Sequence, residues 1–230
     1  MFVRLSSLSE PVAHEQTVPL DRAPSAGYSK SAMGEPAKTK LSYEEFLKLY
    51  DEDTRAEWVD GEVILLSPAS NRHQDLVRFL TAILSPYVEK HQLGVIRPAP
   101  FQMKVGLSGR EPDLLFVAKE HIERLKENYL DGPADLVVEI ISPESRLRDR
   151  GEKLAEYELA GVREYWLIDP EEQRADFYIL GDDGRYDRRR PRPDGRYRSE
   201  VLKGFELDTN WLWRSPLPSV LEVLRELQIV

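Results

Sequence analysis

The sequence predicts an α/β protein in which a mixed central β-sheet is flanked by helices. Apolar residues recur at helical spacing from about residue 70 to residue 91, which indicates a long core helix. The segment LVVEIIS at 136–142 is almost continuously apolar, as expected for a strand covered on both faces. EYWLID and ADFYIL have the composition of paired strands. This order of elements favours a sheet packed between helices.

The first elements along the chain are a leader, a helix and a hairpin. Residues 1–38 are rich in Pro, Ser, Ala and Gly without apolar periodicity, so we predict a flexible leader followed by one domain at 39–230. Ser42 and Glu45 have the spacing of a capping box, which predicts a short helix. Asp60-Gly61 lies between two β-rich runs and predicts a hairpin. We expect Pro86 to kink the long helix that follows.

The later elements are predicted from shorter patterns. Segments 94–106 and 112–118 favour extended chain, and a short helix is expected near 119–128. The arginine-rich segment 185–198 is interpreted as a hairpin, and PSVLEVLRELQ as an amphipathic terminal helix. A second helix is predicted between about 145 and 162 from its apolar positions, which are Leu147, Leu154, Ala155, Leu159 and Val162.

The composition excludes several classes of protein. Cysteine is absent, which excludes disulfides, thiolate zinc sites and cysteine nucleophiles and suits a reducing compartment. No run approaches the roughly 18 apolar residues of a membrane span, and the N-terminus lacks the apolar run of a signal peptide. We therefore expect a cytoplasmic protein without membrane attachment. GxxxxGK[ST] and GxGxxG motifs are also missing, so nothing supports nucleotide binding.

The charge is unevenly distributed along the chain. A formal net charge of −9 argues against general coating of nucleic acids, because phosphate binding relies on Lys and Arg. Segment 185–198, however, has seven Arg and two Asp, a local charge of +5. We predict that Arg188, Arg189 and Arg190 contribute to nucleic-acid binding, with a solvated hairpin as the alternative.

Two acidic residues on apolar strands are the main candidates for chemistry. Glu139 lies inside LVVEIIS, where an ionised carboxylate costs free energy unless it is paired or bound to a metal. Asp113 heads the apolar run DLLFV. If the two strands are neighbours, both carboxylates can share one Mg²⁺, which prefers oxygen ligands and keeps several waters. The alternatives are a Glu139–Arg pair and an Asp113 that simply begins a strand.

Four residues of the second helix are predicted to form one stripe. At 3.6 residues per turn, Arg146, Arg150, Lys153 and Tyr157 share a face that we expect to border the acids. A lysine there could orient water or stabilise a phosphate, whereas a solvated face is the alternative.

Two further residues are supporting candidates. Glu57 alternates with Arg55 and Val59, so it could reach the metal directly or through water. His73 opens the long helix, where a catalytic or phosphate-contacting role competes with that of a cap or a hydrogen-bonded surface residue.

The sequence also resembles a known family. Pro112-Asp113 and the run EIIS at 139–142 resemble the PD-(D/E)XK nuclease signature. The longer segments RAEWVDGEVILLSPASNRHQDL, GREPDLLFV, LVVEIISPES and KLAEYELAGVREYWLIDP resemble the Uma-two family of restriction-endonuclease-like proteins over about residues 41–205.

The resemblance implies a restriction-endonuclease-like fold and an Mg²⁺- or Mn²⁺-dependent endonuclease acting on DNA. It implies that Asp113, Glu139 and the Ile140 carbonyl bind the metal, that Glu57 is an additional acid, and that Lys153 is the catalytic lysine. Ile141 stands where the superfamily has its lysine, so Lys153 would have to reach back from the following helix.

Two other functions remain open at this point. One is a catalytically inactive nucleic-acid-binding or regulatory module, which the net acidity and Ile141 favour. The other is an assembly protein that forms a homodimer through the terminal helix, whose apolar residues are Val220, Leu221, Leu224 and Leu227.

Overall fold

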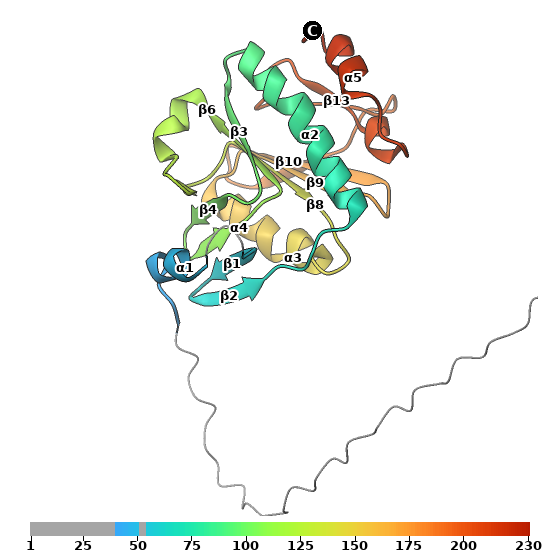
Figure 1. The fold of residues 1–230 in the computed structure, drawn as a ribbon. Coiled ribbons are helices and arrows are strands. Elements are labelled where there is room, and N and C mark those ends of the chain that lie inside the picture. Colours follow the sequence, from blue (N-terminus) through green and yellow to red (C-terminus); the bar gives the residue numbers. More distant parts are fainter. Residues whose placement is uncertain (1–39, 51–53) are drawn as a thin grey trace, which may run out of the picture. The chain divides into compact units, whose positions relative to one another are not determined.

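A six-stranded mixed sheet forms the centre of the fold in the computed structural model, which describes residues 40–50 and 54–230 (Figure 1). Its strand order is β11-β10-β9-β8-β6-β3. β8 and β9 are parallel, and their neighbours are antiparallel, so the predicted mixed sheet is confirmed. The strands are β3 (Gly94–Pro98), β6 (Leu114–Ala118), β8 (Leu136–Ile140), β9 (Glu164–Asp169), β10 (Arg174–Leu180) and β11 (Tyr186–Arg189).

A second sheet has the order β2-β1-β5-β4-β7. The predicted hairpin at Asp60-Gly61 is confirmed: both residues have positive φ, 46° and 84°, as a two-residue type I′ turn requires. The strands are β1 (Ala56–Val59), β2 (Glu62–Leu65), β4 (Gln102–Val105), β5 (Ser108–Arg110) and β7 (Tyr129–Asp131).

The predicted first and long helices are confirmed. α1 (Tyr43–Leu49) begins with the capping box of Ser42 and Glu45. α2 (Asn71–Lys90) is capped by Ser70 and continues as one helix through Pro86. No helix among the described residues is both long and apolar enough to cross a membrane.

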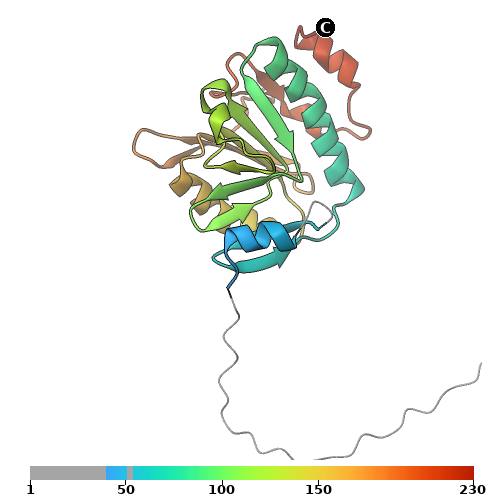
Figure 2. The same ribbon diagram turned by 60° about the vertical axis from the view of Figure 1, so that its left-hand side comes forward.

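The two faces of the central sheet are covered by different elements. Leu136, Val138 and Ile140 of β8 pack in the core formed with α2 and with α5 (Val220–Glu226). Figures 1 and 2 show α2 lying along this face with α5 beside it. Val137 and Ile141 point the other way and pack with α4 (Glu152–Ala160), β4 and β7. The alternation of a strand therefore turns Glu139 toward α4.

The second predicted helix is broken into α3 (Arg146–Arg150) and α4 at Gly151. The expected apolar stripe is therefore wrong: Leu147 is 89% exposed and Leu159 is 91% exposed. Gly151 has φ −122° and ψ −87°, outside helical geometry, so residues before and after it do not share one helical face.

The arginine-rich segment is also not a hairpin. β11 pairs with β10, whereas β12 (Arg196–Arg198) pairs with β13 (Glu206–Asp208) in a separate sheet. Two 3₁₀ helices complete the described chain, namely η1 (Lys119–Arg124) near the predicted 119–128 helix and η2 (Thr209–Trp213). The predicted leader lies outside the described residues, all of which belong to one compact unit.

Candidate active site

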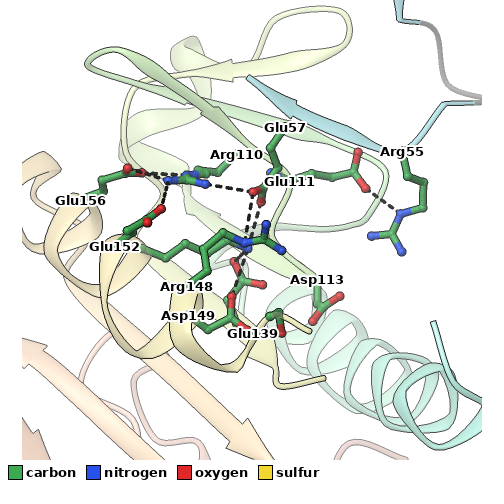
Figure 3. Close-up of polar contacts among 12 residues, drawn as sticks. Arg55, Glu57, Arg110, Glu111, Asp113, Glu139, Arg148, Asp149, Glu152 and Glu156 are labelled. Carbon is green, nitrogen blue, oxygen red and sulfur yellow. Dashed lines mark hydrogen bonds and ion pairs between the residues drawn. The ribbon is translucent and has the colours of Figure 1, made fainter. Parts of the chain in front are cut away.

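Asp113 and Glu139 lie side by side at one end of the central sheet. β6 and β8 pair with Leu114 opposite Val138, so one further step of the register places Asp113 opposite Glu139. Directly opposed residues have Cβ atoms about 4.5–5.5 Å apart and point to the same face. The Ile140 amide also donates a 2.7 Å hydrogen bond to Asp113 Oδ2. Figure 3 shows Asp113 and Glu139 next to each other.

Lys153 reaches Glu139 from α4. Its Nζ donates to Glu139 Oε1 at 2.8 Å, and the Tyr157 hydroxyl donates to the same oxygen at 2.9 Å. Ile141, which occupies the position of the expected lysine, is buried in the apolar layer. Helix α4 therefore supplies the cation that strand β8 lacks.

Glu57 contacts the lysine and not the cleft. It is fully buried, with Oε1 2.9 Å from Lys153 Nζ and Oε2 3.0 Å from Arg110 Nη1. Although burial opposes ionisation, Lys153 and Arg110 lower the pKa of Glu57 to about 2. Glu57 is thus an ionised anchor for Lys153, which differs from the metal-facing position that the sequence suggested.

The buried Arg110 and the partly exposed Glu156 form a support that sequence reasoning missed. The Arg110 guanidinium is fully buried and donates to both carboxylate oxygens of Glu156, at 2.7 and 2.6 Å. This bidentate pair joins β5 to α4 and holds Arg110 against Glu57. The run GREPD, which places Arg110 three residues before Asp113, was the available signal.

Opposite effects set the ionisation of Glu139 and Lys153. Burial, more than any neighbour, raises the pKa of Glu139 to about 8, and nearby carboxylates add to it against the pull of Lys153. For Lys153, burial would lower the pKa, but Glu139, Glu57 and Asp149 together hold it well above its usual value. Lys153 is therefore protonated at neutral pH and acts as a hydrogen-bond donor, not as a base.

His73 is the second partner of Asp113. Its Nε2 lies 3.1 Å from Asp113 Oδ2, and the residue is buried near the start of α2. Its Nδ1 is buried without a hydrogen-bond partner in the described part of the chain. The position suits a residue that orients Asp113, and it does not fit a simple exposed cap.

These residues border a cleft of about 220 Å³ between the segment that follows β2 and the segment that follows β8. Its lining contains three permanent cations, Arg55, Arg148 and Lys153. Five carboxylates outnumber them, from Glu111, Asp113, Glu139, Glu144 and Asp149. If all five were ionised, the lining would carry an excess of two negative charges. Burial and close spacing oppose that joint ionisation, and a divalent cation would favour it by supplying the counter-charge.

Comparison with known proteins identifies the family. A family model described as "Uma2: Putative restriction endonuclease" matches residues 43–210. The chain belongs to the Uma2 family. A crystal structure described as "a putative nuclease belonging to DUF820 from Anabaena variabilis ATCC 29413" is similar, with a TM-score of 0.65 and 19% identity over 75% of this chain and 97% of that chain. The likeness shows the shared fold, and no curated protein matches the chain.

The donor set of this Uma2 protein fits an open metal site. Asp113 uses Oδ2 and Glu139 uses Oε1 in hydrogen bonds, and among the described residues the second oxygen of each carboxylate has no such partner. The part of the chain that the structure describes contains no cluster of three or more His, Cys, Asp or Glu side chains suited to a metal, so the protein would supply only part of the coordination shell. Two carboxylates and a backbone carbonyl match Mg²⁺, which keeps waters and recruits substrate phosphate.

The other predicted cations of the Uma2 chain lie elsewhere. Arg146 and Arg150 do not border the acids as expected, because both bind Asp169 of β9, at 2.7 and 3.0 Å. In the arginine-rich segment, Arg188 binds Asp176 at 2.7 Å and Arg189 binds Asp187 at 3.2 Å. The break at Gly151 explains why Arg146 and Arg150 separate from Lys153 and Tyr157.

Proposed function

We propose that this protein is an Mg²⁺- or Mn²⁺-dependent endonuclease that hydrolyses phosphodiester bonds in DNA. The observation that carries the proposal is the register of β6 and β8, which sets Asp113 beside Glu139 while Lys153 donates to Glu139. Membership in a restriction-endonuclease-like family supports the reaction class.

In this proposal Asp113, Glu139 and the Ile140 carbonyl hold the metal. A bound divalent ion supplies Lewis-acid activation of the phosphate and lowers the pKa of a coordinated water. Tyr157 and Lys153 fix Glu139 by donating to Oε1, so that Oε2 is left for the ligand role. His73 and the Ile140 amide fix Asp113 in the same way through Oδ2.

Lys153 also stabilises negative charge on the phosphate. Its ammonium is protonated, borders the cleft and is held by Glu57 on the side away from solvent. A preorganised donor of this kind acts on charge that develops in the transition state and needs little reorganisation. Arg110 contributes indirectly, because it holds Glu57 and therefore Lys153.

The experiment is cleavage of supercoiled plasmid, linear duplex and single-stranded substrates by the purified full chain. We expect nicked or linear products with Mn²⁺ or Mg²⁺ and none with EDTA. Thermal unfolding with and without Mn²⁺ is measured in parallel, because a ligand that binds only the folded state stabilises it. Stabilisation by Mn²⁺ without cleavage of any substrate would favour the inactive nucleic-acid-binding module, for which the net charge of −9 is the main argument.

Three further predictions receive unequal support. The arginine-rich segment remains a candidate for binding DNA, but acidic partners of Arg188 and Arg189 offset its charge. A homodimer through α5 is disfavoured, because Val220, Leu224 and Leu227 pack against the chain's own core. A cytoplasmic location stays a prediction from the sequence, to which the lack of cysteine contributes.

A further inference from the structure

We propose that Arg148 and Arg55 form a pair that grips the phosphate backbone of a polynucleotide strand from the two walls of the cleft. The pair rests on the proposed function for the identity of the ligand. It concerns binding, and its test does not require cleavage.

Arg148 extends from α3 across the cleft toward Glu57 and Glu111 (Figure 3). Its Nε is buried, and no atom of the described chain accepts a hydrogen bond from it. The nearest carboxylate oxygen is Glu57 Oε2 at 3.9 Å, which Arg110 already contacts at 3.0 Å. The Arg148 side chain is nevertheless 23% exposed, so an anion in the cleft can reach the outer N–H groups of this weakly paired guanidinium and neutralise its charge.

Arg55 enters from the opposite side, next to β1 (Figure 3). Its Nε donates to Glu111 at 2.8 Å, which fixes the plane of the guanidinium. Within residues 40–50 and 54–230, its two Nη groups have no hydrogen-bond partner, and the side chain is 32% exposed. The outer edge of the guanidinium can therefore donate to the two oxygens of a phosphate.

The neighbours of Arg148 show that its position is distinct. Arg146 and Arg150 are two residues away on either side, and both bind the buried carboxylate of Asp169. Arg148 alone of the three lines the cleft beside Asp113 and Glu139. A phosphate held by Arg148 would therefore lie next to the proposed metal ligands, and Arg55 would contact the same strand on the far side.

The test measures binding without metal, so that no substrate is cut. Fluorescein-labelled single-stranded and duplex oligonucleotides are titrated in EDTA at several salt concentrations with wild type, Arg148→Gln, Arg55→Gln and Arg148→Lys. Arg225→Gln, on the exposed surface of α5, is the matched control for the loss of one positive charge. Arg190→Gln reports on the arginine-rich segment.

We expect Arg148→Gln and Arg55→Gln each to weaken binding about tenfold, as loss of a charge-assisted hydrogen bond does. The slope of log affinity against log salt should become shallower by about 0.9 per lost contact on duplex and about 0.7 on single strands. Arg148→Lys should keep the wild-type slope with weaker binding, because lysine keeps the charge but lacks the fork.

An affinity and slope for Arg148→Gln equal to those of Arg225→Gln would overturn the proposal, as would a wild type that binds neither oligonucleotide. A structural role for Arg148 alone would lower the unfolding midpoint and leave the slope unchanged, which also overturns it. The wild type could also bind the oligonucleotides without cleaving them when Mn²⁺ is added. A shallower salt slope in Arg148→Gln and Arg55→Gln would then support the pair, while the lack of cleavage would refute the nuclease.

Discussion

Lys153 is the residue on which the proposed chemistry depends most. It compensates the carboxylates of Glu139, Glu57 and Asp149 at distances of 2.8, 2.9 and 3.4 Å. We predict that Lys153→Gln lowers the cleavage rate about 10²–10³-fold, the cost of removing one preorganised donor. Stabilisation by Mn²⁺ should persist, since Asp113 and Glu139 remain. Lys203→Gln, on an exposed site, is the control, and an equal loss in both variants would contradict the role.

Glu57 connects this network to the stability of the fold. We predict that Glu57→Gln lowers the free energy of unfolding by about 3–5 kcal/mol at pH 7, because the variant leaves buried cations without their partner. Urea unfolding is the measurement, with the exposed Glu62→Gln as control.

The effect of Glu57 should also depend on pH in one direction. The pKa of Glu57 falls from its usual 4.5 to about 2, so its ionised form contributes fully above pH 4.5 and is lost as the pH falls toward 2. The difference between wild type and Glu57→Gln should therefore shrink across that window. A constant difference from pH 7 to pH 2 would show that Glu57 acts through packing alone.

The sequence could predict the acids of the site but not how they are held. Asp113 and Glu139 stand out because each interrupts or heads an apolar strand. The anchoring of Lys153 by Glu57 and of Glu57 by Arg110 joins residues 57, 110 and 153, a tertiary arrangement with no local pattern. Helical periodicity placed Arg146 and Arg150, and not Arg148, on the same face as Lys153, so the position of Arg148 in the cleft was not predicted.

Among the elements, the local signals that worked were those with a direct stereochemical cause. The turn at Asp60-Gly61 and the cap at Ser42 determine their own backbone geometry, and the apolar repeat of α2 fixes its buried face. The prediction for 145–162 failed because Gly151 interrupts the helix, which no apolar spacing reveals. The hairpin predicted within 185–198 failed for a similar reason: β11 pairs with β10, a strand outside this segment, and the local sequence does not reveal that partner.

The corrected arrangement of α3 and α4 makes its own prediction. Leu147→Lys and Leu159→Lys should each change the free energy of unfolding by less than about 0.5 kcal/mol, because both side chains are exposed. Leu76→Ala in α2 should cost about 2–5 kcal/mol, since Leu76 is fully buried. Chemical denaturation measures the free energy of unfolding of the three variants. A decrease of more than about 2 kcal/mol for Leu159→Lys would support the continuous apolar stripe and contradict the exposed position of Leu159.

For the whole molecule, the proposed function raises the question of how an acidic protein would bind a polyanion. The net charge is −9, and carboxylates outnumber permanent cations in the cleft lining by five to three. The arginine-rich segment offsets little of this, because acidic residues pair with several of its arginines, including Arg185 with Glu158 and Arg192 with Glu206. A divalent ion at the cleft, together with Arg148 and Arg55, would supply the local positive charge that substrate requires.

The most direct test of this account is nicking of supercoiled plasmid with Mn²⁺ by wild type and Asp113→Asn. Asparagine keeps the size of the side chain and an oxygen that can accept from the Ile140 amide, so the fold should persist while the charged metal ligand is lost. Asp182→Asn, at an exposed site, controls for the change of charge. The account predicts nicking by wild type and Asp182→Asn and a loss of at least about 10²-fold in Asp113→Asn. Equal nicking by all three proteins would contradict it.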